Sequence, residues 1–280
     1  MTDTALFKTI FIAISIFSMH TTLLAQKSKS TKNDIVLSEL NFGQLAIKTH
    51  IKHAFEQNLD TTGMIVSGIE IVNGLKAYST LKPDSTQRLI WYPTYAYINA
   101  THDFGFTSGP YLYYAKATEK PDATGNYFSI WRKDQNGIFK LIFDGGVNHS
   151  KIRNDYNIAI NNGSTQVSKV KAAAKEIISI PPSLQKTDET INFLNNKVMI
   201  LRTDKPILWG KSQYQPLSTN MIYTQKGSGY DKNGTLFYCF GNLAINATAA
   251  LQRKFHGYYV QVWHFNKKWE IIADLVQLTK

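Results

Sequence analysis

The sequence lacks several features that mark whole classes of protein. It has one cysteine in 280 residues, so it cannot form an intrachain disulfide and its fold must rest on packing. That residue, Cys239, lies in the aromatic run Leu236–Phe240, which predicts a buried and unreactive position. No glycine-rich phosphate loop and no Gly-x-Ser-x-Gly motif occur. The sequence therefore gives no sign of a nucleotide-dependent enzyme or of an esterase-type serine nucleophile.

Long apolar runs are also absent after the first 26 residues. Residues 1–26 instead read as a signal peptide, with Lys8 before the short apolar stretch Phe11–Phe17 and a small residue, Ala25, near the expected cut. That stretch is too short to span a bilayer, although an uncleaved anchor is the alternative. We expect an exported protein, periplasmic or secreted, without a membrane span. The basic stretch that follows, residues 27–37, is predicted to be a disordered tail.

Acidic residues are scarce relative to basic ones. The chain has 31 Lys and Arg against 20 Asp and Glu, which gives a net charge of +11. Residues 27–167 hold 15 basic and 12 acidic side chains, whereas residues 168–280 hold 15 and 7. A positive surface attracts acidic ligands or polymers. The basic residues of the second half are scattered, however, and nucleic-acid binding requires a concentrated patch. We expect no nucleic-acid partner.

The two halves of the chain repeat one pattern. Gly109, Gly125 and Trp131 have counterparts 132 residues later, at Gly241, Gly257 and Trp263. The final strands match at an offset of 130, Phe139–Asp144 with Trp269–Asp274. Matches in one order at a nearly constant offset indicate a duplicated unit. We predict a first domain over 38–153, a linker over 154–167, and a more divergent second domain over 168–280.

Each half reads as helix followed by strands. In the first half, a helix is predicted from Ser38 as N-cap, with Glu39 in its first turn, to Gly63. In the second half, helical segments at 170–180 and from Asp188 precede the strands. The predicted strands are rich in β-branched and aromatic residues and cover 89–100, 104–115, 127–132, 138–144, 221–225, 235–245, 258–265 and 269–275. Helices followed by antiparallel strands predict an α+β fold.

Two passages of the first half carry a family resemblance. They are Leu89–Pro93 with Asp103–Tyr111, and Gly125–Trp131 with Phe139–Gly146. Together with the preceding helix, they resemble the SnoaL-like branch of the nuclear transport factor 2-like superfamily. The resemblance implies two tandem cone-like domains, each a curved antiparallel sheet wrapped around helices, packed as a pseudo-dimer within a monomeric chain. It also implies a pocket at the open end of the cone. Members include isomerases, hydrolases and proteins without catalytic activity, so the resemblance leaves function open.

Aromatic side chains provide the clearest pocket candidates. Period-two spacing places Trp91, Tyr95 and Tyr97 on one strand face, and Tyr127 and Trp131 on one face of another strand. Such stripes often fill a core, but the inner face of a cone is also its pocket wall. Tyr and Trp bring a polar tip to an apolar wall. The predicted ligand-binding residues are Trp91, Tyr95, Tyr97, Phe106, Tyr127 and Trp131, and the expected ligand is a small apolar or aromatic molecule.

Asp144 is the candidate catalytic residue. It follows an apolar strand, and a carboxyl beside an apolar cavity gains a raised pKa and can act as a general base. His149, five residues later, is its candidate partner. Strand alternation, however, puts Asp144 on the same side as Lys140, which favours a hydrogen-bonding role at a strand end. Both interpretations stay open.

Metal ligands are sparse. His50 and His53 lie on adjacent turns of the predicted helix, but no third ligand is in sequence reach, so we expect no metal site and no cofactor. Three functions remain. The first is a binding or accessory protein with a mostly apolar pocket, which the sequence favours. The second is an acid–base isomerase or hydrolase with Asp144 as base, assisted by Tyr95, Tyr97 or His149. The third is a partner-binding module whose pockets are filled.

Overall fold

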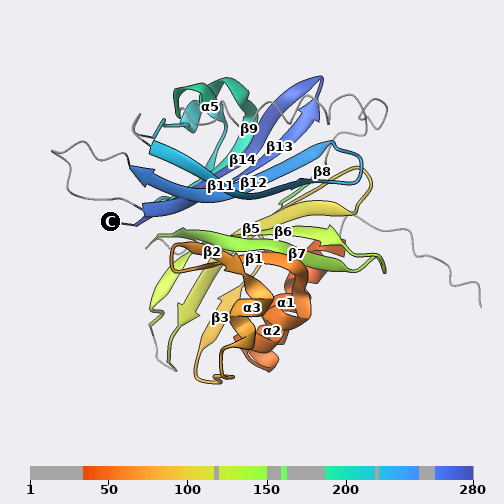
Figure 1. Cartoon of the computed structure of the whole chain (residues 1–280), viewed down its shortest axis with the longest axis vertical. Coiled ribbons are helices and arrows are strands. Elements are labelled where there is room, and N and C mark those ends of the chain that lie inside the picture. The colour runs from red at the N-terminus through yellow and green to blue at the C-terminus, as the bar shows by residue number, and fades with distance from the viewer. Residues whose placement is uncertain are drawn as a thin grey trace, which may run out of the picture. The chain divides into compact units, whose positions relative to one another are not determined.

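The computed structural model describes residues 34–116, 120–149, 159–162, 187–217, 221–245 and 256–279 (Figure 1). All of them belong to one unit, Thr31–Lys280. The predicted signal peptide and the predicted helix at 170–180 lie outside the described residues, so both stay predictions. No helix within the described ranges is long and apolar enough to cross a membrane.

Helices are few and strands are many. The first half contains the helices α1 (Asp34–Lys48), α2 (Ile51–Asn58) and α3 (Gly74–Ser79). Its strands are β1 (Leu59–Ser67), β2 (Glu70–Asn73), β3 (Arg88–Trp91), β4 (Tyr95–Ile98), β5 (Phe104–Tyr114), β6 (Ala123–Lys133), β7 (Phe139–Asn148) and β8 (Ala159–Asn162). The second half contains α5 (Thr187–Phe193), the 3-10 helix η2 (Lys211–Gln213) and the strands β9 (Leu194–Arg202), β10 (Leu208–Trp209), β11 (Met221–Tyr230), β12 (Leu236–Ile245), β13 (His256–Asn266) and β14 (Lys268–Thr279).

The strands form two separate sheets, which confirms the predicted α+β fold class. The first sheet has the order β2-β1-β7-β6-β5-β4-β8, with β3 paired to β5, and the second has the order β10-β9-β14-β13-β12-β11. In both sheets the first long strand runs parallel to the last long strand, β1 beside β7 and β9 beside β14. Antiparallel pairs then follow from β7 to β4 and from β14 to β11. The two halves therefore share a strand order.

The register of the strands matches the sequence offset. Gly109 pairs with Tyr127 in the first sheet, and Gly241 pairs with Tyr259 in the second. The last hairpin of each sheet shifts register beside a tryptophan, at Trp131 and Trp263. One row of directly paired residues crosses the first sheet, and we call it the first row: Ile65, Asp144, Ser129, Thr107 and Ala96. The second row is its counterpart: Ile200, Asp274, Gln261, Cys239 and Ser228.

Three apolar clusters hold these layers together. Helices α1–α3 cover one face of the first sheet (Figure 1), where Phe42 and Phe55 pack with Trp91, Tyr127 and Trp131. A second cluster combines side chains of both sheets, and Phe143 and Phe240 meet in it with ring centres 5.0 Å apart. A third cluster fills the inner face of the second sheet around Trp263. The inner face of the first sheet, under the helices, is where the candidate site lies.

Some predicted boundaries are wrong. Helix α1 begins at Asp34, and the Ser38 hydroxyl donates to the Asp34 carbonyl at 2.8 Å from within the helix instead of capping it. Gly63 does not end a helix, because it lies inside β1. A Cβ there would come within 2.5 Å of the Leu141 carbonyl, so glycine permits the close approach of β1 and β7 where their register shifts. The predicted linker contains β8, which pairs parallel to β4. The domain boundaries themselves stay predictions.

Candidate functional site

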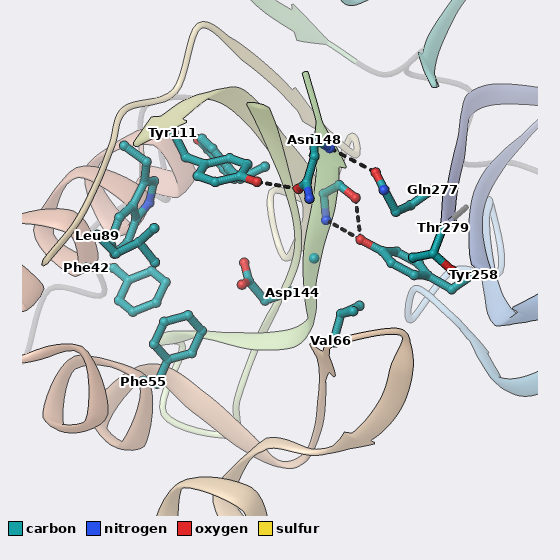
Figure 2. Close-up of a pocket in the computed structure, with 15 residues that line it drawn as sticks. Phe42, Phe55, Val66, Leu89, Tyr111, Asp144, Asn148, Tyr258, Gln277 and Thr279 are labelled. Atoms are coloured by element: carbon teal, nitrogen blue, oxygen red, sulfur yellow. Dashed lines mark hydrogen bonds between the residues drawn. The ribbon is translucent and has the colours of Figure 1, made fainter. Parts of the chain in front are cut away.

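A cavity of about 250 Å³ lies between helices α1 and α2 and the first sheet (Figure 2). Its apolar wall includes Phe42 of α1, Phe55 of α2, and Leu89 and Trp91 of β3. Figure 2 shows Asp144 pointing from β7 toward this wall. Small-molecule pockets usually measure roughly 300–1,000 Å³, so this cavity suits a small ligand.

Asp144 faces the cavity because of a bulge in β7. Trp131 pairs with Leu141 and Ser129 pairs with Asp144, so β7 has one more residue than β6 across this interval. An extra residue reverses the alternation of side chains beyond it. Lys140 and Asp144 therefore face opposite sides although they are four residues apart. The prediction from strand alternation is wrong for Asp144, which lies in the middle of β7 rather than at its end.

A second irregularity separates the predicted aromatic residues. Trp91 pairs with Tyr111 and Tyr95 pairs with Ser108, so the three residues 92–94 oppose only two on β5. This segment contains Pro93, which cannot donate to a strand partner. The alternation of side chains between the two faces is interrupted at this segment. Trp91 and Tyr95 therefore lie on different faces, and the shared face predicted for them is wrong.

The predicted ligand-binding residues consequently divide into two groups. Trp91 and Tyr127 line the cavity, and Trp131 belongs to the same apolar cluster without lining it. The other three belong to the cluster between the sheets and do not line this cavity: Tyr95, Tyr97 and Phe106. Tyr97 stacks on Phe106 with ring centres 5.4 Å apart, so in this pair the aromatic stripe fills a core.

Asp144 is a half-buried carboxyl with one hydrogen-bond donor. The Ser129 hydroxyl donates to its Oδ1 at 2.6 Å, and no cation among the described residues pairs with it. Burial raises the pKa of Asp144 to about 7, the Ser129 hydrogen bond opposes that shift, and the nearby Glu39 carboxyl adds to it. Near neutral pH the side chain is therefore present in both protonation states, so it can accept or donate a proton.

Glu39 is the second carboxyl of the site, and sequence analysis did not identify it as a site residue. It has 0% exposure on α1 and is held by three donors. Trp91 Nε1 donates to it at 2.5 Å and Trp131 Nε1 at 2.8 Å, and the Thr107 hydroxyl also donates to it. Burial raises the pKa of Glu39, while these donors lower it. Because Thr107 and Ser129 are paired neighbours in the first row, the two carboxyls belong to one polar network.

The sequence did contain a signal for Glu39. The buried residues of α1 have the spacing of one helical face and are Ile35, Val36, Glu39, Phe42, Gly43 and Ala46. An acidic residue in the middle of such a face needs polar partners in the core. The predicted start at Ser38 placed Glu39 in the first turn. It left Ile35 and Val36 outside the predicted helix, so the buried face around Glu39 was incomplete. Ile47, an apolar residue in the last turn of the same helix, is 64% exposed.

Tyrosine hydroxyls supply further polar groups. Tyr127 is 6% exposed and lines the cavity, and its hydroxyl has no hydrogen-bond partner among the described residues. The neighbouring Thr107 hydroxyl already donates to Glu39 and accepts from Trp131. The Tyr111 hydroxyl donates to Asn148 Oδ1 across the cavity rim. The Tyr127 hydroxyl is therefore a buried polar group beside Thr107, beneath the surface of the cavity.

The second sheet contributes side chains at the edge of the cavity. The pairing of β1 with β7 ends at Asp144, which leaves the rest of β7 open on that side. The Gly146 amide donates to the Tyr258 hydroxyl at 3.0 Å, and the Asn148 amide donates to Gln277 Oε1 at 2.8 Å. Figure 2 shows both side chains on the side of the cavity away from Phe42. The second half of the chain thus completes the wall of the site.

His149 does not meet Asp144. Five residues of extended strand separate their backbones by about 16 Å. His149 is buried at the far end of β7, where its Nε2 lies 2.5 Å from the side-chain nitrogen of Asn126. The predicted partnership of Asp144 with His149 is therefore wrong, and Ser129 takes that place.

The second row differs from the first around its carboxyl. Asp274 is 2% exposed and forms an ion pair with Arg202. Arg202 Nη1 also donates to the Asp274 carbonyl at 2.8 Å, and Gln261 Nε2 donates to Asp274 Oδ1 at 2.8 Å. The carboxylate is thus neutralised and fully hydrogen-bonded in the described part of the chain, which leaves it no free oxygen for a ligand.

Comparisons with known proteins give partial likenesses. No family model and no curated protein matches the chain. A nuclear transport factor 2-like protein from Cytophaga hutchinsonii is 22% identical, with 41% of this chain and 95% of that chain covered and a TM-score of 0.30. Nuclear transport factor 2 from Cryptosporidium parvum is 13% identical, with 40% and 96% covered and a TM-score of 0.27. A conserved protein from Planctomyces limnophilus is 10% identical, with 38% and 98% covered and a TM-score of 0.28.

Proposed function

We propose that the first half of the chain binds a small, mostly apolar molecule in the cavity between α1, α2 and the first sheet. The observation that carries this proposal is the combination of an aromatic wall with the inward-facing Asp144. Apolar walls supply affinity, and a few polar groups fix the orientation of the ligand. The wall is preorganised, because Phe42 packs edge-to-face on Phe55 and Trp91 with ring centres 4.9 and 4.7 Å apart.

A cavity-blocking variant tests this function. Benzyl alcohol and indole are titrated into the full chain, and binding is followed by amide and indole shifts in nuclear magnetic resonance spectra. We expect shifts at Phe42, Trp91 and Asp144 that Leu89→Trp abolishes, because the larger ring fills the cavity. The exposed Ile222→Trp in the second half is the matched control and should leave binding unchanged. Equal binding by both variants would contradict the proposed site.

Proton transfer is the second candidate function, and the state of Asp144 favours it. A carboxyl with a pKa of about 7 is near the optimum for a general base at neutral pH. The assistants predicted from sequence lie elsewhere, with Tyr95 and Tyr97 in the cluster between the sheets and His149 beside Asn126. The test is exchange of the acidic C–H protons of cyclopentanone for deuterium in deuterated water. We expect Asp144→Asn to abolish any protein-dependent exchange and Glu39→Gln to lower the pH at which it begins.

Two further proposals concern the export of the chain and the family of its two halves. We infer that the chain is exported, and that its halves are two tandem cone-like units of the SnoaL-like branch. The shared strand order and the shared 132-residue offset support the duplication. The mass of the mature protein from an exporting host tests the export, since cleavage at residue 26 removes a defined fragment. A full-length mass would contradict it.

A further inference from the structure

The charge of the cavity is opposite to that of the chain. The sequence carries a net charge of +11, yet no Lys, Arg or His is among the described residues that line the cavity. Asp144 alone is charged there, and Glu39 lies close enough behind the wall to raise the pKa of Asp144. A second negative group near the first makes the local potential more favourable to a cation than to an anion. The site is therefore acidic in a basic protein.

The rest of the lining suits an organic cation better than a metal ion. Divalent metals of the calcium type need six to eight oxygen ligands. Asp144 Oδ2 accepts no hydrogen bond from the described residues, but those residues contain no cluster of three metal-binding side chains. The walls are instead aromatic and comprise Phe42, Phe55, Trp91, Tyr111, Tyr127 and Tyr258. Aromatic faces attract ammonium groups, most strongly where water is excluded.

We propose that the ligand of this cavity is an organic cation, an amine or quaternary ammonium ion with small apolar substituents. Asp144 Oδ2 is its counter-ion, and the ring faces of Phe42, Phe55 and Trp91 surround its apolar groups. This inference rests on the proposed small-molecule function, and it adds the charge of the ligand. A neutral ligand would leave the half-buried carboxylate without a compensating charge.

Binding of a cation should depend on pH through Asp144. The titratable groups around it are Glu39 on α1, Tyr78 on α3, Tyr127 on β6 and Tyr258 on β13. Burial raises the pKa of each of these tyrosines above its usual value, so all three stay neutral near pH 7. The cation binds the ionised form of Asp144, and the population of that form rises as the pH increases past the pKa of about 7. Affinity for the cation should therefore increase about tenfold from pH 6 to pH 8.

Two isosteric pairs of probes test the inference. Choline is compared with 3,3-dimethylbutan-1-ol, and benzylammonium with benzyl alcohol, by calorimetry and by resonance shifts at the cavity. The two members of each pair have nearly the same shape and differ in charge. At pH 8 we expect the cations to bind at least tenfold more tightly than their neutral partners, with the shifts at Asp144 and Trp91. Tighter binding of the alcohols would overturn the inference and leave the proposed function standing, and binding of no probe would count against both.

Two variants separate charge from shape. Asp144→Asn keeps the side-chain volume and should remove both the preference for cations and the pH dependence, while the alcohols bind as before. Phe55→Leu tests the wall by a route that leaves the carboxyl intact, and it should weaken choline more than 3,3-dimethylbutan-1-ol. Melting temperatures establish that each variant is folded. A preference for choline that persists in Asp144→Asn, or that has no pH dependence, would overturn the inference.

Discussion

The first and second rows occupy equivalent positions in the two sheets, yet their carboxyls have different surroundings. Asp144 has one donor, Ser129, and faces a cavity. Asp274 is enclosed, paired with Arg202 and bonded by Gln261. A carboxyl on the inner face of such a sheet must be either paired or able to take up a proton. The pairing of Asp274 with Arg202 gives the second row a structural role. Asp144 pairs with no cation among the described residues, so it can exchange a proton or bind a ligand.

The tryptophans beside the two rows show the same contrast. Trp131 donates to Glu39 and to Thr107. The equivalent Trp263 reaches only the sulfur of Cys239, a weak acceptor, and its indole nitrogen meets no nitrogen or oxygen acceptor in the described residues. The hydrogen bonds that the tryptophan makes in the first half are thus replaced by a sulfur contact in the second. Equivalent positions in the two sheets can therefore form either a functional site or a packed core. A few side chains decide which of the two is formed.

Breaking the ion pair of the second row should have the largest effect. Arg202→Leu leaves Asp274 buried without a cation, so we expect a loss of about 3–5 kcal/mol in the free energy of unfolding. The double variant Arg202→Leu with Asp274→Leu removes both charges and should recover most of that loss. Urea denaturation at pH 7 measures both. A double variant no more stable than the single one would show that packing of Arg202, rather than charge, supports the second row.

The first row should instead make stability depend on pH. The folded-state pKa of Asp144, about 7, lies above its ordinary value of 3.8, so protonation stabilises the folded state. This contribution is complete below pH 3.8 and is lost as the pH rises to 7, with an upper limit of about 4 kcal/mol. Wild type should therefore lose more stability than Asp144→Asn between pH 4 and pH 7 in urea denaturation. Parallel pH curves for the two proteins would contradict a raised pKa.

Much of the fold was predictable because the pattern that specifies it is local or repeated. Strands β5 to β7 and β12 to β14 have strong β-forming composition, and the 132-residue offset identifies them twice. Strand β1 was missed because the chain passes from α2 into β1 at Leu59 without a glycine or proline to mark the change. Gly63, the glycine that is present, serves the crossing of β1 and β7, a contact between distant segments.

The site was predictable only in part, for a related reason. Asp144, Trp91 and Tyr127 were identified by residue type, but the face that a strand residue occupies depends on its partner strand. The extra residue in β7 and the irregular segment at 92–94 become visible only when the register is known. Glu39 required the correct start of α1, because a shift of four residues changes which positions form the buried face. The prediction was limited by the face that each strand residue occupies and by the residue at which α1 begins, and not by residue type.

Exchanging Thr107 and Cys239 should give the smallest and most diagnostic effect. Thr107→Cys removes the donor to Glu39 and the acceptor for Trp131, and we expect a loss of about 1 kcal/mol in the free energy of unfolding. Cys239→Thr places a hydroxyl opposite Gln261 and beside Trp263, where Gln261 Oε1 has no donor and Trp263 Nε1 has no oxygen acceptor among the described residues. The new hydroxyl can donate to the first and accept from the second, so this change should be neutral or stabilising by up to about 1 kcal/mol.

The measurement is urea denaturation of both single variants, with Thr107→Val and Cys239→Val as controls that fill the space without a hydroxyl. Thr107→Val should be at least as destabilised as Thr107→Cys, because the buried donors to Glu39 fall from three to two. Cys239→Thr should be more stable than Cys239→Val, since only threonine can link the amide and the indole. If both exchanges destabilised the protein equally, the two rows would differ in packing and not in hydrogen bonding, and the contrast between them would need another cause.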